Sequence, residues 1–185
     1  MLPEYIFFTG VPGSRWSGIA QEIKSKPGYN LTDRAPHRVY KHGDFSGHMD
    51  AYFGNGMEFP ASPVRQGLYK ENLDKPFQDK KGCKLLLSHE WPYYFEHILD
   101  EYPDAWIQLI YRPDQNSFDW WKQAGGFDIK YPNYDWYISD SIMWERIKEQ
   151  NKLILNFAEK YNISWLQHHT HSDISIGIYY GNTKC

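Results

Sequence analysis

Short apolar runs mark four places along the chain. Each run is bounded by turn-forming residues and has the length of one strand rather than of a helix. The runs are Glu4–Thr9, Cys83–His89, Ala105–Tyr111 and the more polar Ile163–His169. We therefore predict four strands, of which the first two are buried.

Helical periodicity fills the intervals between these runs. Apolar residues recur every three to four positions in Ser14–Lys24, in Trp91–Pro103, from Asp114 to Gly125, and in Tyr134–Tyr161. This alternation predicts a single α/β domain over residues 1–185, with a parallel β-sheet, right-handed crossovers and helices on both faces.

One long region, residues 29–78, lacks either periodicity and is rich in Gly, Pro, His and Asp. A loop region of this length in a compact domain is usually functional, so we predict that it binds a substrate. The residues expected to do so are His42, Asp44, His48, Tyr52 and Phe53. Metal coordination by the histidines and aspartates, a plain polar loop, and a turn packed on the core remain alternatives.

Composition narrows the class of protein. The net charge of −3 gives no electrostatic case for nucleic acid or an anionic membrane surface as a partner. The N-terminus lacks a basic segment followed by an apolar one, and no apolar run is long enough to cross a membrane, so we expect a soluble, cytoplasmic protein. The 18 % aromatic content fits either a bulky core or a ligand-stacking pocket, and the oligomeric state stays open.

Three loops follow the carboxyl ends of the predicted parallel strands, where ligands of such sheets bind. They are Gly10–Ser17, Ser88–His89 and Arg112–Ser117. The first is a Gly/Pro/Ser turn opening into a helix, which predicts an anion site built from backbone N–H groups. The alternative is a turn that only caps the helix. Because Arg15 and Trp16 stand where the ATP-binding loop has Gly-Lys, no lysine is placed between phosphates.

These three segments together resemble motifs of the P-loop sulfotransferase family, which uses 3′-phosphoadenosine 5′-phosphosulfate (PAPS). The matching segments read "PGSRWSG" (12–18), "LSHEWP" (87–92) and "IQLIYRPDQNSFDWW" (107–121). Gly13 stands at the family's loop lysine, Leu87 at a second lysine, and Trp120 at its helix serine. The resemblance implies a P-loop nucleotide-binding fold and transfer of a sulfuryl group from PAPS to a hydroxyl or amine of an unidentified acceptor.

By the same resemblance, His89 is the general base and Arg15 stabilises the transferring group, with no metal required. Arg112 and Ser117 are expected to bind the 3′-phosphate, and Trp16 is a candidate for stacking on adenine. The full set expected to bind the co-substrate is Gly10, Pro12, Gly13, Ser14, Arg15, Trp16, Ser17, Arg112 and Ser117.

Alternatives to this interpretation remain open. His89 could be a structural histidine, and Arg112 an ordinary salt-bridge partner. The chain could instead be a kinase or NTPase that uses Mg-ATP, with Asp114 as a metal ligand, or a non-catalytic nucleotide-binding protein. In "QHHTH" (167–171), His168 and His169 are expected to point to opposite faces of a strand, which disfavours a metal site there.

Overall fold

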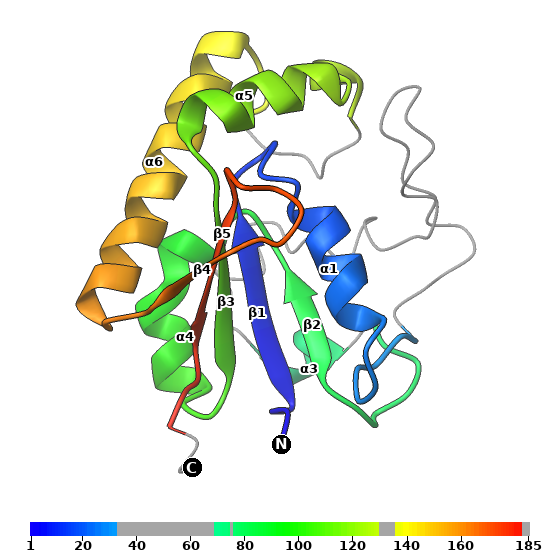
Figure 1. Cartoon of the computed structure of the whole chain (residues 1–185). Helices are drawn as coiled ribbons and strands as arrows, with labels where there is room; N and C mark the ends of the chain where they lie inside the picture. Colours follow the sequence, from blue (N-terminus) through cyan, green and yellow to red (C-terminus); the bar gives the residue numbers. More distant parts are fainter. Residues whose placement is uncertain (33–68, 75, 130–135, 183–185) are drawn as a thin grey trace.

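The computed structural model describes residues 1–32, 69–74, 76–129 and 136–182 of the chain. Their centre is a five-stranded sheet in the order β2-β1-β3-β5-β4 (Figure 1). The strands are β1 (Tyr5–Gly10), β2 (Lys84–Leu87), β3 (Trp106–Tyr111), β4 (Trp165–Gln167) and β5 (Ser175–Tyr179). The α/β class and the three strands β1, β2 and β3 are therefore as expected.

The sheet is mixed, so the prediction of a wholly parallel sheet is wrong. Strand β1 pairs in parallel with both β2 and β3, whereas β5 is antiparallel to β3 and to β4. Only residues 168–174 connect β4 to β5, and a connection that short joins antiparallel neighbours without a helical crossover. The sequence analysis did not predict β5 as a strand.

Helices occupy most of the predicted intervals. They are α1 (Trp16–Lys24), η2 (Trp91–Tyr94), α4 (Phe95–Glu101), α5 (Asp114–Gln123), η3 (Gly126–Asp128) and α6 (Asp140–Lys160). Helix α6 begins later than expected because the Ser139 side chain caps it, accepting a hydrogen bond from the Ile142 amide. The short helix α3 (Lys70–Asp74) lies in the region predicted to be irregular.

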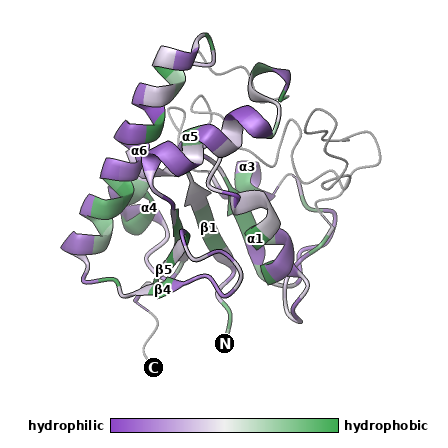
Figure 2. Ribbon diagram, turned by 45° about the horizontal axis from the view of Figure 1, so that its top comes forward, coloured by the Kyte–Doolittle hydropathy of each residue, from purple (hydrophilic) through white to green (hydrophobic). Residues whose placement is uncertain are grey.

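Helices cover both faces of the sheet. Phe7 and Phe8 are neighbours on β1 and so point to opposite faces. Phe8 stacks on Trp16 of α1, with ring centroids 6.0 Å apart, whereas Phe7 meets Trp91 of η2 at 5.2 Å. Figure 2 shows hydrophilic residues along α5 and α6 and hydrophobic residues on β1, which lies between the helical layers.

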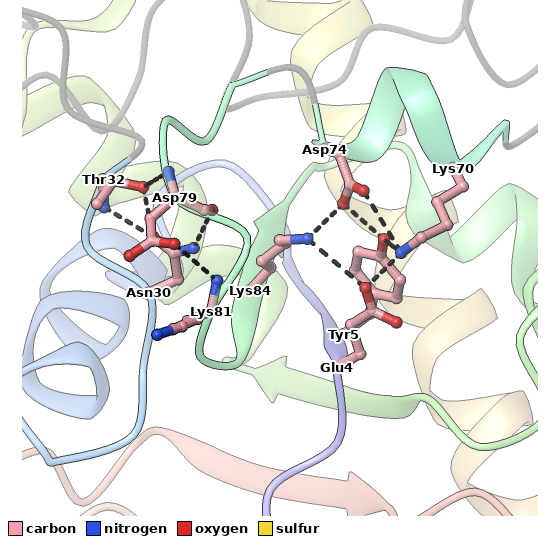
Figure 3. A network of polar contacts seen from close by, with 9 residues as sticks. All are labelled: Glu4, Tyr5, Asn30, Thr32, Lys70, Asp74, Asp79, Lys81 and Lys84. Carbon is pink, nitrogen blue, oxygen red and sulfur yellow. Dashed lines mark hydrogen bonds and ion pairs between the residues drawn. The ribbon is translucent and has the colours of Figure 1, made fainter.

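A buried lysine joins α3 to the sheet where β1 and β2 begin (Figure 3). Lys84 on β2 is 1 % exposed, and its Nζ lies 2.5 Å from Asp74 Oδ1. Tyr5 on β1 donates its hydroxyl to the same carboxylate at 2.6 Å. Burial alone raises the pKa of Asp74, but the hydrogen bonds from Lys84 and Tyr5 and the nearby ammonium groups hold this pKa below its usual value.

A second polar network joins the chain on either side of residues 33–68 (Figure 3). The Asn30 side chain donates to the Asp79 carbonyl at 2.7 Å and accepts from the amide and hydroxyl of Thr32. The backbone N–H of Asn30 donates to the Cys83 carbonyl at 2.8 Å. Residues 30–32 and 79–83 are therefore held together. The five residues expected to bind the acceptor, 42 to 53, lie outside the described part of the chain.

Within the described residues, no helix combines the length and the apolar character needed to cross a membrane.

Candidate functional site

The sheet order makes the carboxyl ends of β1 and β3 the expected place for a ligand. Strand β1 is flanked by β2 on one side and β3 on the other, so the connection from β1 to β2 and the connection from β2 to β3 run in opposite directions along the sheet. Ligands of open α/β sheets bind at such a switch point, outside the carboxyl ends of the strands. The loops that follow β1 and β3 meet there, as the sequence analysis expected (Figure 1).

The loop after β1 is a tight turn packed directly against α5. The Ser14 amide donates to the Val11 carbonyl at 3.0 Å, and Gly13 has φ of 80°. A Cβ atom at Gly13 would lie 1.8 Å from the Ser117 carbonyl oxygen. Only glycine therefore permits both this backbone conformation and this approach of the loop to α5.

Donor groups gather where the turn becomes α1. Arg15 is the N-cap residue, in the left-handed region at φ 61°, and its side chain makes no capping hydrogen bond. The first N–H groups of a helix have no intrahelical acceptor, and they carry partial positive charge. The Ser14 hydroxyl is fully buried and has no hydrogen-bond partner in the described part of the protein. This arrangement suits an anion.

Two guanidinium groups lie next to these donors. The Arg15 guanidinium carbon lies 4.1 Å from the centre of the Trp120 ring, and that of Arg112 lies 5.9 Å from the same ring. Burial and the charge of Arg112 lower the pKa of Arg15. Two cations held this close repel each other, so an anion bound between or beside them would be stabilised.

Arg112 is already partnered. Its Nε lies 2.6 Å from Asp173 Oδ2, and its Nη1 donates to the Gly13 carbonyl at 3.0 Å. Asn116 donates to the same Asp173 oxygen at 2.9 Å. The salt-bridge alternative for Arg112 is therefore present in the structure. By contrast, no carboxylate among the described residues forms an ion pair with Arg15, which leaves Arg15 as the guanidinium available to a ligand.

Other members of the expected nucleotide-binding set lie inside the protein. Ser117 is fully buried in the first turn of α5 and donates its hydroxyl to the Arg112 carbonyl at 3.2 Å. Ser17 is also buried, as is Pro12. A Cβ atom at Gly10 would lie 2.6 Å from Ser14 Oγ, so the glycine leaves room for the Ser14 hydroxyl. These residues shape the loop from within.

His89 and Trp16 lie against each other beneath the loop. Their ring centroids are 4.0 Å apart, and His89 is fully buried. His89 Nδ1 makes a hydrogen bond with the Gly10 carbonyl, and Gln150 of α6 donates to the His89 carbonyl at 2.8 Å. Burial lowers the pKa of His89 to about 3, despite the opposing effect of the Gly10 hydrogen bond. The structure thus places both rings in the interior.

Sequence reasoning did not select Trp120 or Asp173 as site residues. Trp120 was noted only as the residue at the family's serine position, although its ring contacts both guanidinium groups. Asp173 lies in the connection between β4 and β5, where no motif points to it. Asp114, the alternative magnesium ligand, accepts a hydrogen bond from Asn151 of α6 at 2.6 Å.

Comparisons with family models, with curated proteins and with solved structures give no match to this chain.

Proposed function

We propose that the chain binds a nucleotide through its phosphate groups at the carboxyl edge of β1 and β3, and that it is a PAPS-dependent sulfotransferase. The observation that carries the proposal is the position of the Arg15 guanidinium. It lies over Trp120, close enough to Arg112 for the two charges to interact, at the uncapped start of α1. Phosphate oxygens would accept hydrogen bonds from Arg15 and from the first N–H groups of α1.

Three features favour PAPS over Mg-ATP as the co-substrate. The loop has no lysine at the position that contacts the β- and γ-phosphates in ATPases and GTPases. The carboxylate that follows β3, Asp114, is engaged by Asn151 on α6. In addition, the three segments that resemble the sulfotransferase family lie at the carboxyl ends of β1, β2 and β3, which are neighbours in the sheet.

In the proposed reaction, the acceptor oxygen attacks sulfur and the bond from sulfur to the 5′-phosphate oxygen breaks. The acceptor proton passes to His89. The hydrogen bond from Nδ1 to the Gly10 carbonyl leaves the basic lone pair of the neutral ring on Nε2. Because His89 is fully buried, it can act as the base only if acceptor binding opens access to the ring.

The burial of His89 favours a second candidate, a non-catalytic nucleotide-binding protein. The His89 imidazole is fully buried and its pKa is lowered to about 3. Its hydrogen bond to the Gly10 carbonyl joins the ends of β1 and β2, which is a structural role. In this case the anion site would bind the nucleotide, and no group transfer would follow.

We expect calorimetry to detect binding of 3′-phosphoadenosine 5′-phosphate that does not need Mg²⁺, and weaker binding of ATP. Arg15→Ala should weaken the former by about 10- to 100-fold, the value of one or two charge-assisted hydrogen bonds. Lys148→Ala is the control: it removes an equal charge from an exposed side chain of α6 and should leave affinity unchanged.

Each outcome decides between the candidates. Binding that persists undiminished in Arg15→Ala would contradict the proposed site, and a strict requirement for Mg²⁺ would favour the kinase alternative. If the nucleotide binds, transfer from radiolabelled PAPS to a panel of hydroxyl and amine acceptors is measured with wild type and His89→Gln. Transfer that the variant lacks supports the sulfotransferase, and binding without transfer supports the non-catalytic protein.

A further inference from the structure

Two histidines and a glutamate from distant parts of the chain meet beside α1. The connection from β4 to β5, which contains His168 and His169, reaches across the upper edge of the sheet toward α1 (Figure 1). His168 Nε2 lies 3.4 Å from Glu22 Oε2, and His169 Nδ1 lies 3.8 Å from Glu22 Oε1. One potential ligand atom from each of the three residues lies within 4.8 Å of the other two.

This geometry overturns the expectation that the two histidines point to opposite faces of a strand. Strand β4 ends at Gln167, one residue before the pair. The two imidazole rings therefore follow the local turn and lie 4.6 Å apart, inclined by 30°. Both rings face the same carboxylate, so the reason for disfavouring a metal site here no longer holds.

We propose that Glu22, His168 and His169 bind a zinc ion. Zinc takes imidazole nitrogen and carboxylate oxygen at about 2.0–2.2 Å in tetrahedral geometry, which requires ligand atoms roughly 3.3 Å apart. Each histidine nitrogen lies near this distance from one Glu22 oxygen, 3.4 Å from Oε2 for His168 and 3.8 Å from Oε1 for His169. Two histidines and one carboxylate leave the fourth position to water. Magnesium and calcium prefer sites made of oxygen ligands alone.

His168 is oriented for this role before any ion binds. Its side chain is only 5 % exposed, and its ring stacks on His171 with centroids 5.3 Å apart. Its Nδ1 accepts a hydrogen bond from the Thr170 backbone N–H at 3.3 Å. When Nε2 binds the metal, the proton moves to Nδ1, which would then donate to Thr170 Oγ1 at 3.2 Å in place of that bond. Glu22 and His169 are 47 % and 66 % exposed, so an ion can reach the site from solvent.

Zinc bound here would join α1 to the connection between β4 and β5. The same connection carries Asp173, which holds Arg112 at the anion site. The metal would therefore stabilise the position of Asp173 relative to the start of α1. The inference itself rests on the three ligands alone and does not depend on the nucleotide proposal.

The test is calorimetric titration of the chelator-treated full chain with Zn²⁺, Mg²⁺ and Ca²⁺, followed by thermal unfolding with and without Zn²⁺. We expect Zn²⁺ alone to bind at this site and to raise the unfolding temperature. Glu22→Gln and His169→Asn, both at exposed side chains, should weaken that binding by at least about 100-fold, the upper range for loss of an outer-shell partner.

His97→Asn is the matched control because His97 is exposed on α4, away from these ligands. It should bind Zn²⁺ as the wild type does. Absence of zinc binding would overturn the proposal. So would zinc binding, or zinc-dependent stabilisation, that is equal in wild type, Glu22→Gln and His169→Asn, because the ion would then occupy another site. Equal binding of Mg²⁺ would contradict the ligand chemistry.

Discussion

Gly13→Ala is expected to destabilise the protein by about 2–5 kcal/mol, through two effects that add. A Cβ atom at this position would overlap the Ser117 carbonyl oxygen at 1.8 Å, and that atom belongs to helix backbone that cannot rotate away. The positive φ of 80° costs a further ~1–2 kcal/mol for any L-residue. Overpacking a close contact typically adds about 1–3 kcal/mol.

Chemical denaturation, followed by circular dichroism, measures this loss. Gly18→Ala is the matched control because Gly18 is exposed within α1 and has no positive φ. The same change there should stabilise the helix by about 0.5–1 kcal/mol. Equal stability of Gly13→Ala and wild type would show that the loop does not pack on α5 as described. If Gly13→Ala folds, displacement of Ser14 and Arg15 should abolish the nucleotide binding proposed above.

Lys84→Ala is expected to destabilise the protein by about 3 kcal/mol. The substitution removes a fully buried side chain and leaves Asp74, whose side chain is 30 % exposed, without its closest cation. Removing one partner of a buried ion pair costs roughly 3–5 kcal/mol, and the partial exposure of Asp74 places this pair at the lower end. Lys152→Ala, at an exposed position of α6, should change stability by less than about 0.5 kcal/mol.

The contribution of the Lys84–Asp74 pair should depend on pH in a defined direction. The pKa of Asp74 is lower in the folded protein than its usual value, so its ionised form stabilises the fold. This stabilisation is complete above the unfolded pKa of about 3.9 and is lost as pH falls through the folded pKa. Lys84→Met keeps most of the side-chain volume, so its effect on stability reports the loss of the ammonium charge and not the loss of packing.

Denaturation at pH 7 and at decreasing pH tests this dependence. The difference in the free energy of unfolding between wild type and Lys84→Met should shrink below about pH 4, as Asp74 becomes protonated in both. A difference that stays constant from pH 7 to pH 2 would mean that packing, and not the ion pair, accounts for the effect of the substitution.

Much of the fold could be predicted from local pattern. The apolar runs at Glu4–Thr9, Cys83–His89 and Ala105–Tyr111 correspond to β1, β2 and β3, because their length and flanking turn residues favour a buried strand over a helix. Their parallel pairing follows from the helical segments between them. Strand β5 was missed because "SIGIY" (175–179) is mostly half-buried and its place in the sheet comes from its pairing with β3 and β4.

For the candidate site, too, local sequence predicted some features and long-range contacts determined the others. The sequence indicated the loop after β1, Arg15 and Arg112, because a Gly/Pro/Ser turn between a strand and a helix is a local pattern. It did not indicate that Arg112 pairs with Asp173, sixty-one positions away, or that both guanidinium groups lie over Trp120. It also did not indicate the complete burial of His89, which depends on how neighbouring elements cover the end of β2.

The amino-acid sequence by itself determined the three parallel strands, the turns at their carboxyl ends and the edge of the sheet where a ligand would bind. These features depend on periodicity and turn chemistry within a few residues. Only the tertiary structure decided the antiparallel edge, the interior position of His89, and the meeting of Glu22 with His168 and His169. Contacts between residues far apart in the chain depend on how whole elements pack, and no local pattern encodes that packing.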